Sequence, residues 1–265
     1  MENETVSENS GKIESFQETP NNYLNAFLQK EGRVARKIII FYVVWLVLFQ
    51  TLLWIHILEN GERKDIAILS MSLGLIVFWI FIGGSIMRFI REPLRLKLQK
   101  HTNKRVLKFF LFATLLACIE EIVTTGMTNT APLWGFSPHE VYITASPNYF
   151  EVIFLHSVIV FLPAFLVWGI LLEKYRFHPN WVLLLYGLTG TISETMSFGP
   201  QNMLYFAFWG LVYGLIVYLP AYSLPKKEER KKPNIFHYTM AVVLPLLATI
   251  PMAILVMFIH SILGI

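Results

Sequence analysis

The sequence has little charge and almost no cysteine, and both shortages limit what the protein can be. Only 15% of its 265 residues are charged and 55% are hydrophobic, whereas a soluble domain carries about 25% charged residues. This balance excludes a soluble globular enzyme, a disordered protein and a nucleic-acid-binding domain, in spite of the net charge of +4. The single cysteine, Cys118, excludes an intramolecular disulfide and is expected to pack as a small apolar residue.

What the sequence has in plenty is long apolar blocks. A helix needs about 20 apolar residues to cross the hydrocarbon core of a bilayer, and these blocks are too long and too uniform for the alternating strands of a barrel. The sequence therefore predicts an all-α, polytopic integral membrane protein with about seven transmembrane helices. The predicted spans are 38–58, 66–90, 106–127, 149–172, 181–199, 203–223 and 236–263.

The residues before the first span form two further predicted segments. Residues 1–20 are polar and acidic and predict a disordered tail, without the apolar core of a cleavable signal peptide. Residues 21–37 combine apolar and basic side chains, which fits an interfacial amphipathic helix or an ordered lead-in to the first span. Residues 38–265 are then a single transmembrane helical domain.

Lysine and arginine predict the orientation. They gather before the first span and in the links between spans two and three, four and five, and six and seven, while the alternate links are almost bare. Because basic loops stay on the cytoplasmic side, the N-terminus is predicted inside and the C-terminus outside. We expect a multi-pass protein of the cell membrane, with the lipid bilayer as its partner and its oligomeric state open.

Four ionisable residues lie well inside the predicted spans: Glu120, Glu121, His156 and Glu194. An acidic residue at the centre of a membrane helix costs about 2.5–3.5 kcal/mol, and such residues are functional by default. At 1.5 Å per residue all four fall at similar depth in the outer half of the bilayer. They come from three consecutive helices, so we expect them to meet in one polar pocket.

Three carboxyl groups without a deep cation cannot all be ionised at low cost. Either the carboxyls share a proton, or His156 takes the proton and pairs with a carboxylate, or a divalent metal ion is bound. In the last case the candidate ligands are Glu121, His156 and Glu194, since carboxylate and imidazole are common metal ligands. The first two cases suit general acid–base catalysis and the third suits metal-assisted hydrolysis, so a metal cofactor stays open.

Small residues form stripes on two of the helices. Gly187, Gly190, Thr191, Glu194 and Ser197 share one face of the fifth span, and Gly210 and Gly214 form a GxxxG pair in the sixth. Because small residues let helix backbones approach closely, we interpret the GxxxG pair as a packing feature.

A Glu-Glu pair in one span followed by a His in the next resembles the glutamate-dependent intramembrane protease clade, which includes the CPBP and PrsW-like families. The segment 187–194 resembles the glycine-rich, Glu-ending second motif of PrsW-like proteins, although the Arg that follows the Glu pair in CPBP proteins is replaced here by Thr125. The resemblance implies that Glu121 or Glu120 activates water. His156 and Glu194 would then polarise that water or stabilise the oxyanion.

The leading hypothesis is a membrane-embedded hydrolase or peptidase with a hydrophobic or membrane-embedded substrate. The alternatives are a proton- or cation-coupled transporter or channel, and a structural membrane subunit without catalysis. The inner halves of spans three to five are almost purely apolar, and a pocket open to one side favours an enzyme over a conduit.

Overall fold

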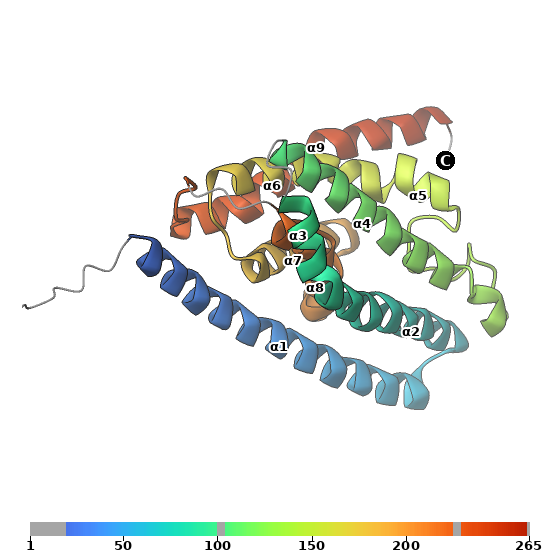
Figure 1. Cartoon of the computed structure of the whole chain (residues 1–265). Coiled ribbons are helices and arrows are strands. Elements are labelled where there is room, and N and C mark those ends of the chain that lie inside the picture. Colours follow the sequence, from blue (N-terminus) through green and yellow to red (C-terminus); the bar gives the residue numbers. More distant parts are fainter. Residues whose placement is uncertain (1–19, 100–103, 225–228, 264–265) are drawn as a thin grey trace, which may run out of the picture.

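The computed structural model describes residues 20–99, 104–224 and 229–263, and these form a bundle of helices (Figure 1). The predicted tail 1–20 therefore lies, except for Pro20, outside the described residues. In chain order the elements are α1 (Pro20–Asn60), α2 (Arg63–Leu75), η1 (Ile76–Gly83), α3 (Gly84–Gln99), α4 (Arg105–Thr128), η2 (Ala131–Trp134), α5 (Tyr149–Leu155), α6 (Ser157–Lys174), α7 (Pro179–Phe198), η3 (Pro200–Tyr205), α8 (Phe206–Ser223) and α9 (Ile235–Leu263).

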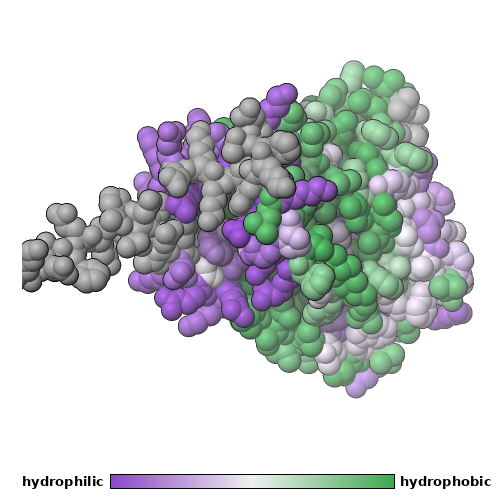
Figure 2. All heavy atoms as spheres, in the orientation of Figure 1, coloured by the Kyte–Doolittle hydropathy of each residue, from purple (hydrophilic) through white to green (hydrophobic). Residues whose placement is uncertain are grey.

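The described part of the chain contains five helical stretches that are long and apolar enough to cross a membrane. They are Gln29–Asn60, Arg63–Leu98, Ser157–Lys174, Pro200–Ser223 and Ile235–Ile262. A broad band of hydrophobic side chains runs between two more polar ends of the molecule (Figure 2). The prediction of an all-α, polytopic membrane protein is thus confirmed, whereas the number seven and the orientation stay predictions. The two remaining predicted spans correspond to α4 and α7, the helices that carry the glutamates.

Two predicted boundaries change because helices continue past the apolar blocks. Helix α1 is continuous over 41 residues, so the segment 21–37 is the first part of the same helix that carries the first span. The second span also continues without interruption, from Arg63 through the π-helical segment η1 to the basic residues of α3. A hydropathy pattern shows only which part of a helix is apolar. A helix whose end is basic extends beyond that part.

The fourth predicted span, 149–172, is wrong as a single helix. It is divided into α5 and α6 at His156, whose backbone angles of φ −137° and ψ −101° lie outside the helical region. His156 and Ser157 are the only polar residues between Val152 and Leu162, and two such residues do not interrupt the apolar block enough to mark the break. One residue with non-helical angles is enough to separate two helices without interrupting the apolar block.

The centre of the bundle is the packing of α7 against α8. A Cβ atom on Gly187 would overlap the carbonyl oxygen of Gly210, and a Cβ on Gly214 would lie 2.7 Å from the carbonyl oxygen of Leu183. The two helices therefore touch backbone to backbone, which agrees with the packing interpretation of the GxxxG pair. Large apolar side chains on the outer faces of α1 and α9 remain exposed, as expected for surfaces that contact lipid.

Candidate functional site

Three glutamates lie on α4 and α7, two of them buried and the third half-buried. Glu120 and Glu121 come from α4 and are each 7% exposed, and Glu194 comes from α7. Glu194 lies in the wider neighbourhood of both of the other carboxyls, without a hydrogen bond to either among the described residues. These three groups are called here the carboxyl cluster, and the expectation that spans three and five bring their acidic residues together stays a prediction.

Each carboxyl of the cluster accepts a hydrogen bond from a hydroxyl group. Thr124 Oγ1 donates to Glu120 Oε1 at 2.6 Å, and Thr144 Oγ1 lies 3.4 Å from Glu121 Oε2. The Ser157 hydroxyl also donates to Glu121, and the Tyr213 phenol donates to Glu194. Hydroxyl donors on every carboxyl lower the cost of keeping these groups away from water.

Tyr213 is the cluster residue that sequence reasoning missed. Its ring lies directly against Gly190, where a Cβ atom would overlap it, and Gly190 precedes Glu194 by one helical turn on the same face. On α8, the adjacent Val212 carbonyl accepts a hydrogen bond of 3.0 Å from the Trp79 indole of η1. The small stripe on α7 could have indicated a bulky partner opposite Gly190, but nothing in the sequence selects Tyr213.

The loop between η2 and α5 covers the cluster at the end opposite the basic links. Thr144 belongs to this loop, and three further hydrogen bonds tie the loop and the first residue of α5 to α4 and the residue that follows it. Asn129 Nδ2 donates to the Pro147 carbonyl at 2.9 Å, Tyr149 OH donates to the Cys118 carbonyl at 2.9 Å, and the Ile143 amide donates to Thr128 Oγ1 at 3.2 Å. Glu121, which contacts the loop, is therefore the glutamate of the α4 pair nearest to it.

His156 does not join the carboxyl cluster, which corrects the expected four-residue pocket. Its ring packs against the ring of His260 on α9 with centroids 4.5 Å apart, and His260 Nε2 lies 2.7 Å from the Leu155 carbonyl oxygen. No hydrogen bond or ion pair joins His156 to the three glutamates within the described ranges. A residue's position along its helix gives its depth in the membrane but not the direction in which its side chain points. That direction would follow from the helical repeat, and the break between α5 and α6 interrupts the repeat at His156.

The candidate metal ligands Glu121, His156 and Glu194 do not form a metal site. Within the described residues, no group of three or more His, Cys, Asp and Glu side chains is arranged to hold a metal ion. The donor set therefore does not fit the metal-assisted case. Among the described residues, the groups that contact these carboxyls are the hydroxyl donors named above.

Towards the basic end of the bundle the cluster is bounded by apolar packing. Ala113, Leu116 and Ala117 of α4 are buried one to two turns below the glutamates, and Phe165 and Trp168 of α6 are fully buried. Comparisons of the chain with family profiles, with curated protein sequences and with solved structures give no match.

Proposed function

We propose that the carboxyl cluster is the reaction centre of a membrane-embedded hydrolase in the cell membrane, in its specific form a peptidase for membrane-embedded substrates. The observation that carries the proposal is the convergence of three carboxyls and one phenol inside an apolar helix bundle. Ionisable groups are expensive in such surroundings, and their grouping is typical of acid–base chemistry.

The positions of the groups favour distinct roles. Glu121 lies beside the covering loop and would remove a proton from a water molecule, whose oxygen then forms a bond to the carbonyl carbon of the substrate. Glu120, deeper and hydrogen-bonded to Thr124, would give its proton to the amine nitrogen as the carbon–nitrogen bond breaks and the electron pair leaves with nitrogen. Tyr213, whose hydroxyl donates to Glu194 in the resting protein, would turn that one hydrogen from Glu194 to the oxyanion. In the protease resemblance His156 was expected to share that last role, and Tyr213 takes its place.

The apolar packing below the cluster supports an enzyme rather than a conduit. A transport path needs polar access from both faces of the membrane, whereas Ala113, Leu116 and Ala117 separate the carboxyls from the basic end. The hydroxyl donors Thr144 and Ser157 lie on the opposite side, toward the covering loop. Water and substrate would therefore reach the glutamates from one side only.

The proposal is tested with the full-length chain in liposomes and a panel of synthetic single-span peptides. In water enriched in oxygen-18, hydrolysis places the heavy isotope in each new carboxyl terminus, and mass spectrometry detects it. We expect Glu121→Gln to lower the rate by at least about a hundredfold, because it removes the general base. Glutamine keeps the shape of glutamate, so this variant should remain folded.

Glu140→Gln is the matched control, because Glu140 is exposed in the covering loop and contacts Ser137 rather than the carboxyl cluster. It should cleave the same peptides at the rate of the unaltered chain. Cleavage that persists in Glu121→Gln, or that falls equally in both variants, would count against the hydrolase.

A proton- or cation-coupled transporter is the second candidate, favoured by the helix break next to Ser157. Interrupted membrane helices with polar groups at the break are common at transport sites, and Ser157 directly follows the break and donates to Glu121. This candidate predicts that an imposed pH gradient drives flux in sealed liposomes and that Glu194→Gln abolishes it. Liposomes that show no flux under a gradient would eliminate it.

A further inference from the structure

The helical stretch formed by α2, η1 and α3 is longer than a membrane crossing requires. It is uninterrupted from Arg63 to Gln99, and Arg88 lies about 37 Å along its axis from Arg63 at 1.5 Å per residue. The hydrocarbon core of a bilayer is about 30 Å thick. Arg88 and the residues after it are therefore at the depth of the lipid headgroups, at the basic end of the bundle.

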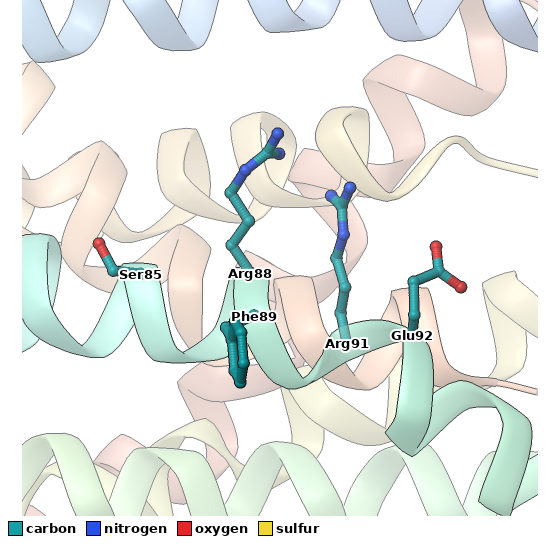
Figure 3. Close-up of a pocket in the computed structure, with 5 residues that line it drawn as sticks. All are labelled: Ser85, Arg88, Phe89, Arg91 and Glu92. Carbon is teal, nitrogen blue, oxygen red and sulfur yellow. The ribbon is translucent and has the colours of Figure 1, made fainter.

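A hollow of about 460 Å³ lies against α3 at this depth. It is lined by Ser85, Arg88, Phe89, Arg91 and Glu92. Figure 3 shows the side chains of Arg88 and Arg91 extending from α3 on the same side, while Phe89 points away from them. Phe89 is 85% exposed, so α3 presents two guanidinium groups on one face and an aromatic ring on another.

The two arginines differ in how they are held. Arg91 Nη1 lies 2.7 Å from the Tyr218 hydroxyl, and its guanidinium carbon lies 4.8 Å from the ring centroid of Tyr222. Arg88 makes no hydrogen bond or ion pair with any described residue. One arginine is thus fixed in place and the other is free to close on a ligand.

Glu92 is the acidic group in the lining of the hollow, and its charge is already offset. Arg95 forms an ion pair with it at 2.7 Å, and the Tyr222 hydroxyl donates to the same carboxylate. The free positive charge of Arg88 therefore has no acidic competitor among the lining residues. This combination favours an anion with several acceptor oxygens, because guanidinium groups bind phosphate through paired hydrogen bonds.

We propose that this hollow binds the phosphate of an anionic glycerophospholipid. Arg88 and Arg91 hold the phosphate oxygens, Ser85 contributes a hydroxyl to the headgroup, and the acyl chains lie along the apolar surface that includes Phe89. The position beside a membrane span suits a lipid, since anionic headgroups gather around basic residues at this depth. The site is separate from the carboxyl cluster and does not depend on the hydrolase proposal.

The test measures binding of three probes to the full-length chain purified in a neutral detergent. They are dioctanoyl phosphatidylglycerol, dioctanoyl phosphatidylcholine and inorganic phosphate, and native mass spectrometry gives the bound fraction of each. We expect phosphatidylglycerol to bind at least tenfold more tightly than phosphatidylcholine. Arg88→Gln should weaken phosphatidylglycerol about tenfold, because it removes one charge-assisted contact.

Lys97→Gln is the matched control, because Lys97 is an exposed cation on the same helix and does not line the hollow. It removes the same charge and should weaken binding far less than Arg88→Gln. Arg91→Lys keeps the charge but loses the paired geometry, and should also weaken binding. If Arg88→Gln and Lys97→Gln weaken binding equally, general surface charge and not a specific site attracts the lipid. Inorganic phosphate that binds as tightly as phosphatidylglycerol would overturn the lipid as its ligand.

Discussion

His178 caps the start of α7 and also packs against α1. The Nδ1 atom of His178 accepts a hydrogen bond of 3.1 Å from the Asn180 amide, which needs the neutral imidazole. The ring also lies against Gly32 of α1, where a Cβ atom would overlap it. Burial lowers the pKa of His178 below its usual value of 6.5, and the charge of Arg91 lowers it further while Glu31 opposes the shift.

This lowered pKa predicts how stability depends on pH. The unfolded chain binds a proton at His178 near pH 6.5, whereas the folded chain binds it only at lower pH. Stability from this residue is therefore complete above about pH 6.5 and declines as the pH falls toward the folded-state pKa. We expect the Tm of the purified chain to fall between pH 7.5 and 5.5. The Tm of His178→Asn should fall less over this pH range. Asparagine keeps a hydrogen-bond acceptor for the helix cap.

His139→Asn serves as the comparison, because His139 is an exposed residue of the covering loop. Its Tm should follow the same pH curve as the unaltered chain. If His178→Asn shows an undiminished decline, the pH dependence arises elsewhere and the neutral cap is not its cause.

At the scale of elements, the contact between α7 and α8 builds the carboxyl cluster. The glycine face of α7 allows α8 to approach until the Tyr213 ring covers Gly190, and this places the phenol at Glu194. Gly190→Ala should push the ring away, separate the phenol from Glu194 and lower stability by about 1–3 kcal/mol, as overpacking does. Thermal unfolding measures the loss of stability. The peptide-cleavage assay measures the effect of the displaced phenol.

Gly126→Ala provides a matched substitution in α4. A Cβ atom there has no heavy atom of another group within 4 Å, and alanine favours a helix over glycine by about 1 kcal/mol. This variant should be as stable as the unaltered chain or slightly more stable. A Gly190→Ala protein that unfolds at the same temperature as Gly126→Ala would show that the close approach is not needed.

The sequence predicts helices well and the composition of the cluster only in part. Apolar blocks and their lengths predict the membrane helices, because a helix in lipid must be apolar over a fixed distance. The depth of Glu120, Glu121 and Glu194 predicts that they meet. The break at His156 and the contribution of Tyr213 depend on backbone angles and on rotation about the helix axes, which neither depth nor hydropathy encodes.

At the scale of the whole molecule, charge and hydropathy are separated along one direction. The apolar band lies between two polar ends (Figure 2), and basic residues such as Arg95, Lys97, Lys174 and Lys231 lie in or beside the links that the sequence predicts to be cytoplasmic. The carboxyl cluster lies within the bundle, nearer the end that carries the covering loop. One orientation of this arrangement in a bilayer satisfies the preference of basic links for the cytoplasm.

That orientation requires α4 and α7 to cross the membrane, which is a testable expectation. With 24 and 20 residues, they span about 36 and 30 Å at 1.5 Å per residue, enough for the hydrocarbon core. In a Cys118→Ala background, Ser137→Cys and Gln201→Cys should react with an impermeant maleimide on intact cells. Lys104→Cys and Lys174→Cys, at the other ends of the two helices, should react only after the cells are opened. If Lys104→Cys and Ser137→Cys are labelled from the same side, α4 does not cross the membrane. If Lys174→Cys and Gln201→Cys are labelled from the same side, α7 does not cross it. In either case the carboxyl cluster would belong to a bundle with fewer than seven spans.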